Sequence, residues 1–219
     1  MNRLAIFDCD GTLADSQATI CQAMDRAFAA CAIPAPGDAA ARRIIGLSLP
    51  EAMQVLHPDG AADDHAALAL AYKAAFVELR GAGLAREPLF DGIRDVIDRL
   101  DRDGWLLGVA TGKSDRGLRL MLEQHGLHPR FVTLQTADRH PSKPHPSMLD
   151  LAMAEAGAEP ATTVMIGDTS FDMAMARAAG CFAVGVSWGY HREDALWTAG
   201  AHRVAHHPSD LPGLLAALA

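Results

Sequence analysis

Six side chains able to do acid, base or nucleophilic chemistry stand at four points where an apolar run gives way to a polar loop. The apolar runs 4–7, 105–110, 131–134 and 163–166 are typical of buried strands. The polar residues that follow them along the chain are Asp8 and Asp10, Thr111, Lys143, and Asp168 with Asp172. Because ligands bind at the carboxyl edge of a parallel sheet, we expect these side chains to meet there.

Several carboxylates at one sheet edge predict a metal site. Carboxylates held close together repel one another, and a hard cation with oxygen ligands keeps them ionised. Mg²⁺ fits best, because it needs few protein carboxylates and shares the oxygens of a substrate phosphate. One carboxylate beside the metal would then be free to attack phosphorus.

The elements between these loops predict an α/β fold. Helix-compatible stretches at 115–125, 146–156 and 171–179 follow three of the loops. Apolar strands that alternate with such helices indicate βαβ units and a parallel sheet with helices on both faces.

The stretch after the first loop differs, because it shows helical periodicity and almost no strand pattern. Residues 20, 24, 27, 28 and 31 recur at helical spacing, and the Ala-rich run 64–79 predicts a long helix. We therefore expect a core formed by 1–15 and 88–219, into which a four-helix lobe, 16–87, is inserted.

Composition excludes several classes of protein. The 219 residues are 50% hydrophobic and carry a formal charge of −8, which disfavours a nucleic acid partner. No apolar run approaches the roughly 18 residues of a membrane span, so no membrane association is expected. The spacing of the four cysteines is not that of a disulfide framework, which favours a reducing cytoplasm. The apolar run at the start of the sequence is interrupted by Asp8 and does not resemble an export signal.

Four motifs in this order resemble the full motif set of the haloacid dehalogenase superfamily of phosphohydrolases. They read Asp8-Cys9-Asp10-Gly11-Thr12-Leu13, Thr111-Gly112-Lys113, Ser142-Lys143-Pro144 and Gly167-Asp168-Thr169-Ser170-Phe171-Asp172. The run Lys143-Pro144-His145-Pro146 and the helical insertion are most similar to the phosphoglycolate phosphatase-like branch. The resemblance implies a Rossmann-like parallel sheet with an inserted, mobile helical cap.

The same resemblance implies catalytic roles. Asp8 is the expected nucleophile, which forms an aspartyl-phosphate, and Asp10 is the expected general acid and then base. Thr111 would donate its hydroxyl to the phosphoryl oxygens, helped by the N–H of Gly112. Lys143 would neutralise charge on the nucleophile and on the transferring group. A helix cap for Thr111 and a surface charge for Lys143 are the structural alternatives.

The metal ligands implied by the resemblance are Asp8, Asp10, Asp168 and Asp172. Asp10 would contribute its backbone carbonyl, which leaves its side chain free for proton transfer. Asp172 would either orient a metal-bound water or pair with Lys143. A purely structural role is also open for Asp172, because an acidic residue is favoured in the first turn of a helix.

The expected substrate is a small phosphate monoester, with 2-phosphoglycolate as the first candidate and a sugar phosphate as the second. A helical lid of about 70 residues leaves little room for a large leaving group. We expect Gly11 and Thr12 to contact the substrate, and Arg42 or Arg43 to bind its carboxylate. The motifs leave the oligomeric state open.

Two rival functions remain open at this point. A sugar phosphomutase would reuse the aspartyl-phosphate and return the phosphoryl group to a second hydroxyl. A non-catalytic phospho-accepting or binding protein could be built on the same fold, although the intact pair Asp8 and Asp10 argues against it.

Overall fold

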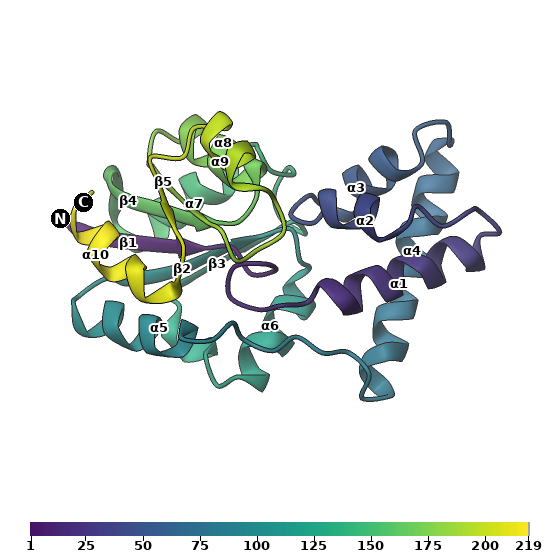
Figure 1. Ribbon diagram of the computed structural model, residues 1–219, viewed down its shortest axis with the longest axis horizontal. Coiled ribbons are helices and arrows are strands. Elements are labelled where there is room, and N and C mark those ends of the chain that lie inside the picture. Colours follow the sequence, from purple (N-terminus) through teal and green to yellow (C-terminus); the bar gives the residue numbers. More distant parts are fainter. Residues whose placement is uncertain (219) are drawn as a thin grey trace.

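A parallel sheet of six strands forms the centre of the larger of two lobes in the computed structural model, which describes residues 1–218 (Figure 1). The strand order is β3-β2-β1-β4-β5-β6, and every neighbouring pair is parallel. The strands are β1 (Asn2–Phe7), β2 (Leu106–Thr111), β3 (Thr133–Thr136), β4 (Ala158–Gly167), β5 (Phe182–Val186) and β6 (Arg203–Ala205). The predicted Rossmann-like α/β fold is confirmed.

Helices cover both faces of the sheet because the strand residues alternate between two cores. Ala5 and Phe7 of β1 pack in one core, and Leu4 and Ile6 pack in the other. The first core is closed by α5 (Ile93–Arg102), α6 (Asp115–Gln124) and α10 (Leu211–Ala216). The second is closed by α7 (Ser147–Ala156), α8 (Ser170–Ala178) and α9 (Glu193–Thr198). Short 3₁₀ helices lie at His128–Arg130 and Pro208–Asp210.

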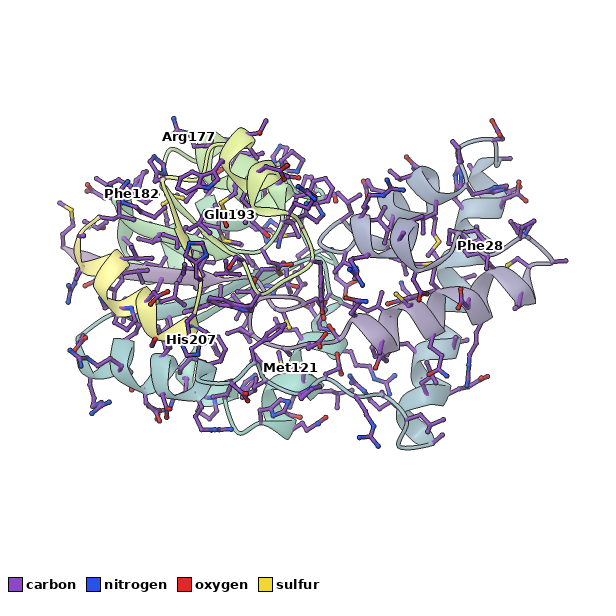
Figure 2. The ribbon with its side chains drawn as sticks, viewed as in Figure 1. Phe28, Met121, Arg177, Phe182, Glu193 and His207 are labelled. Carbon is purple, nitrogen blue, oxygen red and sulfur yellow. The ribbon has the colours of Figure 1, made fainter. Side chains whose placement is uncertain are left out.

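The smaller lobe consists of four helices inserted after β1 (Figure 1). They are α1 (Gln17–Ala30), α2 (Asp38–Arg43), α3 (Leu49–Leu56) and α4 (Ala62–Gly81). Met24 and Phe28 lie one turn apart on α1 and pack against Met53 of α3 and Leu68 of α4. Figure 2 shows Phe28 inside this lobe, well away from Met121 on α6 of the sheet lobe. We call residues 16–87 the cap.

The chain leaves and re-enters the sheet lobe at adjacent points. Ala14 and Leu89 form an isolated antiparallel bridge, and the N–H of Asp15 donates to the carbonyl of Pro88 at 2.8 Å. The two crossing segments therefore lie side by side, and we propose the division into a core (1–15 and 88–219) and a cap (16–87) at this point.

The segment that joins α2 to α3 reaches the carboxyl edge of the sheet. The N–H of Ser48 donates to the Oγ of Ser142 at 2.8 Å. A Cβ added to Gly112 would lie 2.5 Å from the carbonyl oxygen of Leu47. The cap backbone thus packs directly on the loop that follows β2, and this contact requires glycine at position 112.

Strand β6 is not among the strands that the sequence pattern predicts. It is three residues long, it pairs only with β5, and Ala205 is its one buried residue. None of the helices within residues 1–218 combines the length and the apolar character needed to cross a bilayer.

Candidate active site

Asp8 is the first residue after the central strand β1. Its neighbour Phe7 pairs with Val109 on one side and Ile166 on the other, so Asp8 lies where three strands end. Its side chain is 1% exposed. The carboxylate Oδ1 accepts hydrogen bonds from the N–H of Cys9 at 2.6 Å and from the Nζ of Lys143 at 3.0 Å. Oδ2 is buried and has no hydrogen-bond partner among the described residues.

The electrostatic surroundings of Asp8 favour its neutral form when no cation is bound. The surroundings together raise the pKa of Asp8 from 3.8 to about 7, and burial is the largest cause. The positive charge of Lys143 opposes this rise in pKa, while the negative charges of Asp172 and Asp10 add to it. A cation beside this carboxylate would favour its charged form.

Three buried carboxylates form an acidic cluster that we define as Asp8, Asp168 and Asp172. Each offers one oxygen that lies within 4.8 Å of the others. Asp168 follows β4, and its oxygens accept from the hydroxyl of Thr12 at 2.9 Å and the N–H of Tyr190 at 2.8 Å. Burial and the charges of Asp8 and Asp172 raise the pKa of Asp168 well above its ordinary value.

Asp172 already has donors on both oxygens. Its Oδ1 accepts from Lys143 at 2.6 Å, and its Oδ2 accepts from the N–H of Thr169 at 3.0 Å and from the Thr169 hydroxyl at 2.7 Å. Thr169 and Asp172 form a capping box at the start of α8. Of the alternatives for Asp172, the geometry favours pairing with Lys143 over direct contact with a metal.

Lys143 is fully buried, and its ammonium bridges two members of the acidic cluster. Its Nζ lies 3.0 Å from Asp8 and 2.6 Å from Asp172. Burial lowers the pKa of Lys143, but the charges of Asp172 and Asp8 outweigh burial and raise it. Lys143 therefore remains an ammonium and does not fit the alternative of a solvated surface charge.

Thr111 ends β2 and is 1% exposed. Its hydroxyl oxygen accepts from the N–H of Lys113 at 3.3 Å, and its hydroxyl hydrogen has no acceptor within residues 1–218. That hydrogen is free to bind a phosphoryl oxygen. The helix cap suggested as an alternative is provided instead by Ser114, whose Oγ accepts from Gly117.

The side chain of Asp10 does not join the acidic cluster. The Oδ1 of Asp10 accepts from the hydroxyl of Ser16 and pairs with the Nζ of Lys113 at 2.8 Å. The side chain of Asp10 therefore makes its contacts outside the acidic cluster.

Gly11 and Thr12, which are expected to contact the substrate, both lie against Asp168 of the acidic cluster. The N–H of Gly11 donates to Ala14 within the loop, and a Cβ at Gly11 would lie 2.2 Å from the Oδ2 of Asp168. The hydroxyl of Thr12 binds Asp168. Both residues thus shape and hold the acidic cluster.

Arg42 and Arg43 are exposed at the end of α2, and neither forms an ion pair within the part of the chain described. Arg43 lines a cleft between cap and core together with Phe171, whereas Arg42 does not. The carbonyl of Arg43 also contacts the Nε2 of His191 at 3.3 Å. Arg43 therefore lies at the boundary of cap and core, and no member of the acidic cluster lines the same cleft.

Three residues that contact the candidate site had no role predicted from the sequence: Lys113, Ser16 and Tyr190. Lys113 and Ser16 bind Asp10. Tyr190 holds Asp168 through its N–H, and its hydroxyl accepts from the N–H of Ser16 at 3.0 Å. The one available signal was that Lys113 lies two residues after Thr111, within the motif.

Comparisons with known proteins agree with this geometry. The family model described as haloacid dehalogenase-like hydrolase matches residues 5–186. A protein of Dickeya dadantii (strain 3937) named "Probable phosphatase IndB" is 37% identical over 223 residues, which cover 100% of this chain and 95% of that protein. A phosphoglycolate phosphatase of Vibrio parahaemolyticus is 27% identical over 218 residues, covering 95% and 94% of the two chains.

Solved structures show the same likeness. The crystal structure of a hydrolase from Pseudomonas syringae superimposes with a TM-score of 0.87 at 26% identity, covering 100% of both chains. With the family match across most of its length, this chain belongs to the haloacid dehalogenase-like hydrolases.

Proposed function

We propose that this protein is a magnesium-dependent phosphatase that hydrolyses small phosphate monoesters through an aspartyl-phosphate on Asp8. The observation that carries the proposal is the buried Oδ2 of Asp8, which has no hydrogen-bond partner within residues 1–218 although Lys143 and Cys9 fix its twin oxygen. A buried carboxylate oxygen without a donor is costly unless a cation or a reacting group occupies the space beside it. The phosphatase names of similar proteins support the same assignment.

In the first step a carboxylate oxygen of Asp8 forms a bond to phosphorus. The bond from phosphorus to the ester oxygen breaks, and its electron pair stays on that oxygen, which takes a proton from Asp10. In the second step Asp10 removes a proton from water, and the water oxygen bonds to phosphorus. The bond to Asp8 then breaks, which releases inorganic phosphate and restores both carboxyl groups.

Thr111 and Lys143 stabilise the charge that spreads over the phosphoryl oxygens during both steps. The hydroxyl hydrogen of Thr111 is unused by the described part of the protein, and the ammonium of Lys143 stands 3.0 Å from the nucleophile. Asp172 keeps that ammonium in place. Groups fixed before the reaction in this way need no reorganisation when charge develops.

The acidic cluster fits Mg²⁺ in the chemistry of its donors. Asp8 and Asp168 would hold the ion with their carboxylates, and the carbonyl of Asp10 would be the further protein ligand. When bound, the ion neutralises the carboxylates and draws the phosphoryl oxygens toward the nucleophile. Because both oxygens of Asp172 have protein donors, we place Asp172 behind Lys143.

The cap favours a small substrate. Its segment between α2 and α3 packs on Gly112 and Ser142, next to Thr111 and Lys143, which restricts the space for a large leaving group. We propose 2-phosphoglycolate first and a sugar phosphate second, with Arg43 as the cation that would bind a substrate carboxylate.

The decisive experiment is a screen of phosphate monoesters with the purified protein, measuring released phosphate with magnesium and with excess chelator. We expect hydrolysis only with magnesium, and the highest kcat/KM for 2-phosphoglycolate. The function is wrong if no monoester releases phosphate, and an isomerised sugar phosphate without released phosphate would identify a mutase instead.

Matched variants test the substrate. Arg43→Ala should raise the KM for 2-phosphoglycolate by roughly 10-fold or more, since a charge-assisted pair is lost. Its KM for an aryl phosphate that has no carboxylate should stay the same. Arg42→Ala should change neither KM. Equal changes for both substrates would refute carboxylate recognition by Arg43.

Metal binding is expected to stabilise the folded protein. At a magnesium concentration of about 100 Kd, a ligand that binds only the native state contributes ~2.7 kcal/mol. For a domain of this size that corresponds to a rise in Tm of roughly 5–10 °C. Thermal unfolding of wild type should show this rise, and Asp168→Asn should abolish it; an equal rise in both would place the metal elsewhere.

The pH dependence of the metal-free protein has a defined sign. The unfolded Asp8 loses its proton near 3.8, but the folded one keeps it to about 7. The unfolded state therefore binds fewer protons in this window, so the free energy of unfolding contributed by Asp8 falls as pH rises from about 4 to about 7. Denaturant titrations of wild type and Asp8→Asn should show a smaller fall in the variant, in which the raised pKa of Asp168 still contributes.

A further inference from the structure

Lys113 is a mostly buried charged residue that the proposed reaction leaves without a role. It lies in the loop between β2 and α6, and its side chain is 9% exposed. Its Nζ stands 2.8 Å from the Oδ1 of Asp10 and 2.7 Å from the Oε1 of Glu87. Glu87 is 2% exposed and lies on the segment that returns from the cap.

All donors found on Asp10 meet the same oxygen. The hydroxyl of Ser16 and the ammonium of Lys113 both contact Oδ1. No donor contacts Oδ2 within residues 1–218, and the side chain as a whole keeps 10% of its surface exposed. Two donors on one oxygen fix the plane of a carboxyl group and leave the other oxygen to carry a proton.

We propose that Lys113 is a positioning residue for Asp10, which holds Oδ1 so that Oδ2 exchanges protons with the leaving group and with water. The inference rests on the proposed function, because it takes Asp10 as the general acid and base. Lys113 touches no reacting atom and acts through Asp10 alone.

The ion pairs around Lys113 indicate that its role is not limited to neutralising Glu87. Glu87 has a second cation, since its Oε2 pairs with Arg80. Within the described chain Asp10 has no other cation than Lys113. Because Arg80 also pairs with Glu87, Lys113 is not required solely to neutralise Glu87 and can hold Asp10.

The anchors of Lys113 come from the cap and its return segment. Arg80 stands on α4, as does Phe76, whose ring centre is 5.7 Å from the Nζ of Lys113. Glu87 takes one donor from Arg80 and one from Lys113. The position of the Asp10 carboxyl is thus tied to α4 through Lys113.

The test is the dependence of kcat/KM on the leaving group, measured with aryl phosphates from dinitrophenyl to unsubstituted phenyl phosphate. kcat/KM reports only the steps up to departure of the phenolate, so it isolates the acid role of Asp10. A poor leaving group needs the proton most. Lys113→Met should therefore lose activity on phenyl phosphate by roughly 10-fold or more beyond its loss on dinitrophenyl phosphate.

Lys73→Met is the matched control, because it removes an exposed lysine from α4 and should leave the dependence unchanged. Lys113→Arg keeps the charge and should restore part of the wild-type dependence. An equal loss on every aryl phosphate in Lys113→Met would show a structural role only and overturn the proposal.

A second pair of variants tests the proposal if Lys113→Met does not fold. Lys113→Met deprives buried Glu87 of one cation, and a charge left short of partners is destabilising. If the single variant does not fold, Lys113→Met with Glu87→Gln should show the steeper dependence relative to Glu87→Gln alone. An unchanged dependence in that pair would overturn the proposal equally.

Failure of this inference is distinguishable from failure of the proposed function. If Asp10→Asn steepens the dependence but Lys113→Met does not, Asp10 is the acid and Lys113 does not position it. If Asp10→Asn leaves the dependence unchanged, the assigned role of Asp10 is wrong, and with it the basis of the inference.

Discussion

Replacement of Asp8 by asparagine is expected to reduce phosphate release by roughly 10⁴-fold or more, because the amide cannot form the bond to phosphorus on which both steps depend. The Oδ1 contacts with Cys9 and Lys143 can persist in the variant, since an amide oxygen accepts the same hydrogen bonds. The loss should therefore be chemical and leave the fold intact.

The variant should also be more stable than wild type when no metal is bound. The amide nitrogen would replace the unpartnered Oδ2 and remove one negative charge from the acidic cluster. Initial rates and thermal unfolding in chelator, measured on the same preparations, test both statements. Turnover near the wild-type rate would refute the assignment of Asp8 as the nucleophile. If the variant is unfolded, its loss of activity would reflect lost structure and not lost chemistry.

Asp10→Asn is expected to slow turnover by roughly 10²–10⁴-fold, the usual contribution of a positioned general acid and base. With a good leaving group such as dinitrophenolate, the first step needs no proton and Asp8 should still be phosphorylated. The second step lacks the base that activates water. The phosphorylated enzyme should therefore accumulate.

Mass spectrometry of the intact chain, quenched during turnover, should show one added phosphoryl group on this variant. The double variant with Asp8→Asn is the control and should show none. An unmodified chain with normal turnover in Asp10→Asn would exclude the acid and base role, and a phosphoryl group on the double variant would place the nucleophile at another residue.

The sequence predicted which side chains meet at the carboxyl edge of the sheet, because position along a strand determines it. Asp8, Thr111 and Asp168 each follow or end an apolar run, and adjacent parallel strands must present such residues together. The resemblance in four motifs then added roles that strand positions alone do not define. The structure shows that Asp172 accepts a hydrogen bond from Lys143. The spacing of these two residues in the sequence does not reveal this contact.

The contacts of Lys113 were missed because they join residues far apart in the chain. Glu87 is 26 positions before Lys113 and lies in a segment without periodicity. A lone lysine in a loop has no pattern that distinguishes burial from exposure, so only packing of α4 against the loop after β2 reveals it. Strand β6 escaped for a related reason: Arg203 and the flanking histidines mask a single buried alanine.

The bridge between Ala14 and Leu89 has a consequence for how such a protein can diversify. Both ends of the cap meet at this bridge, so the cap is inserted as a closed loop. The entropic cost of closing a loop grows only slowly with the length of the loop. A cap of different size or helix number could replace 16–87 at little thermodynamic penalty, provided that its ends meet at this bridge. Caps of different structure can thus be accommodated at one place in the chain, while the strand ends that carry the acidic cluster stay the same.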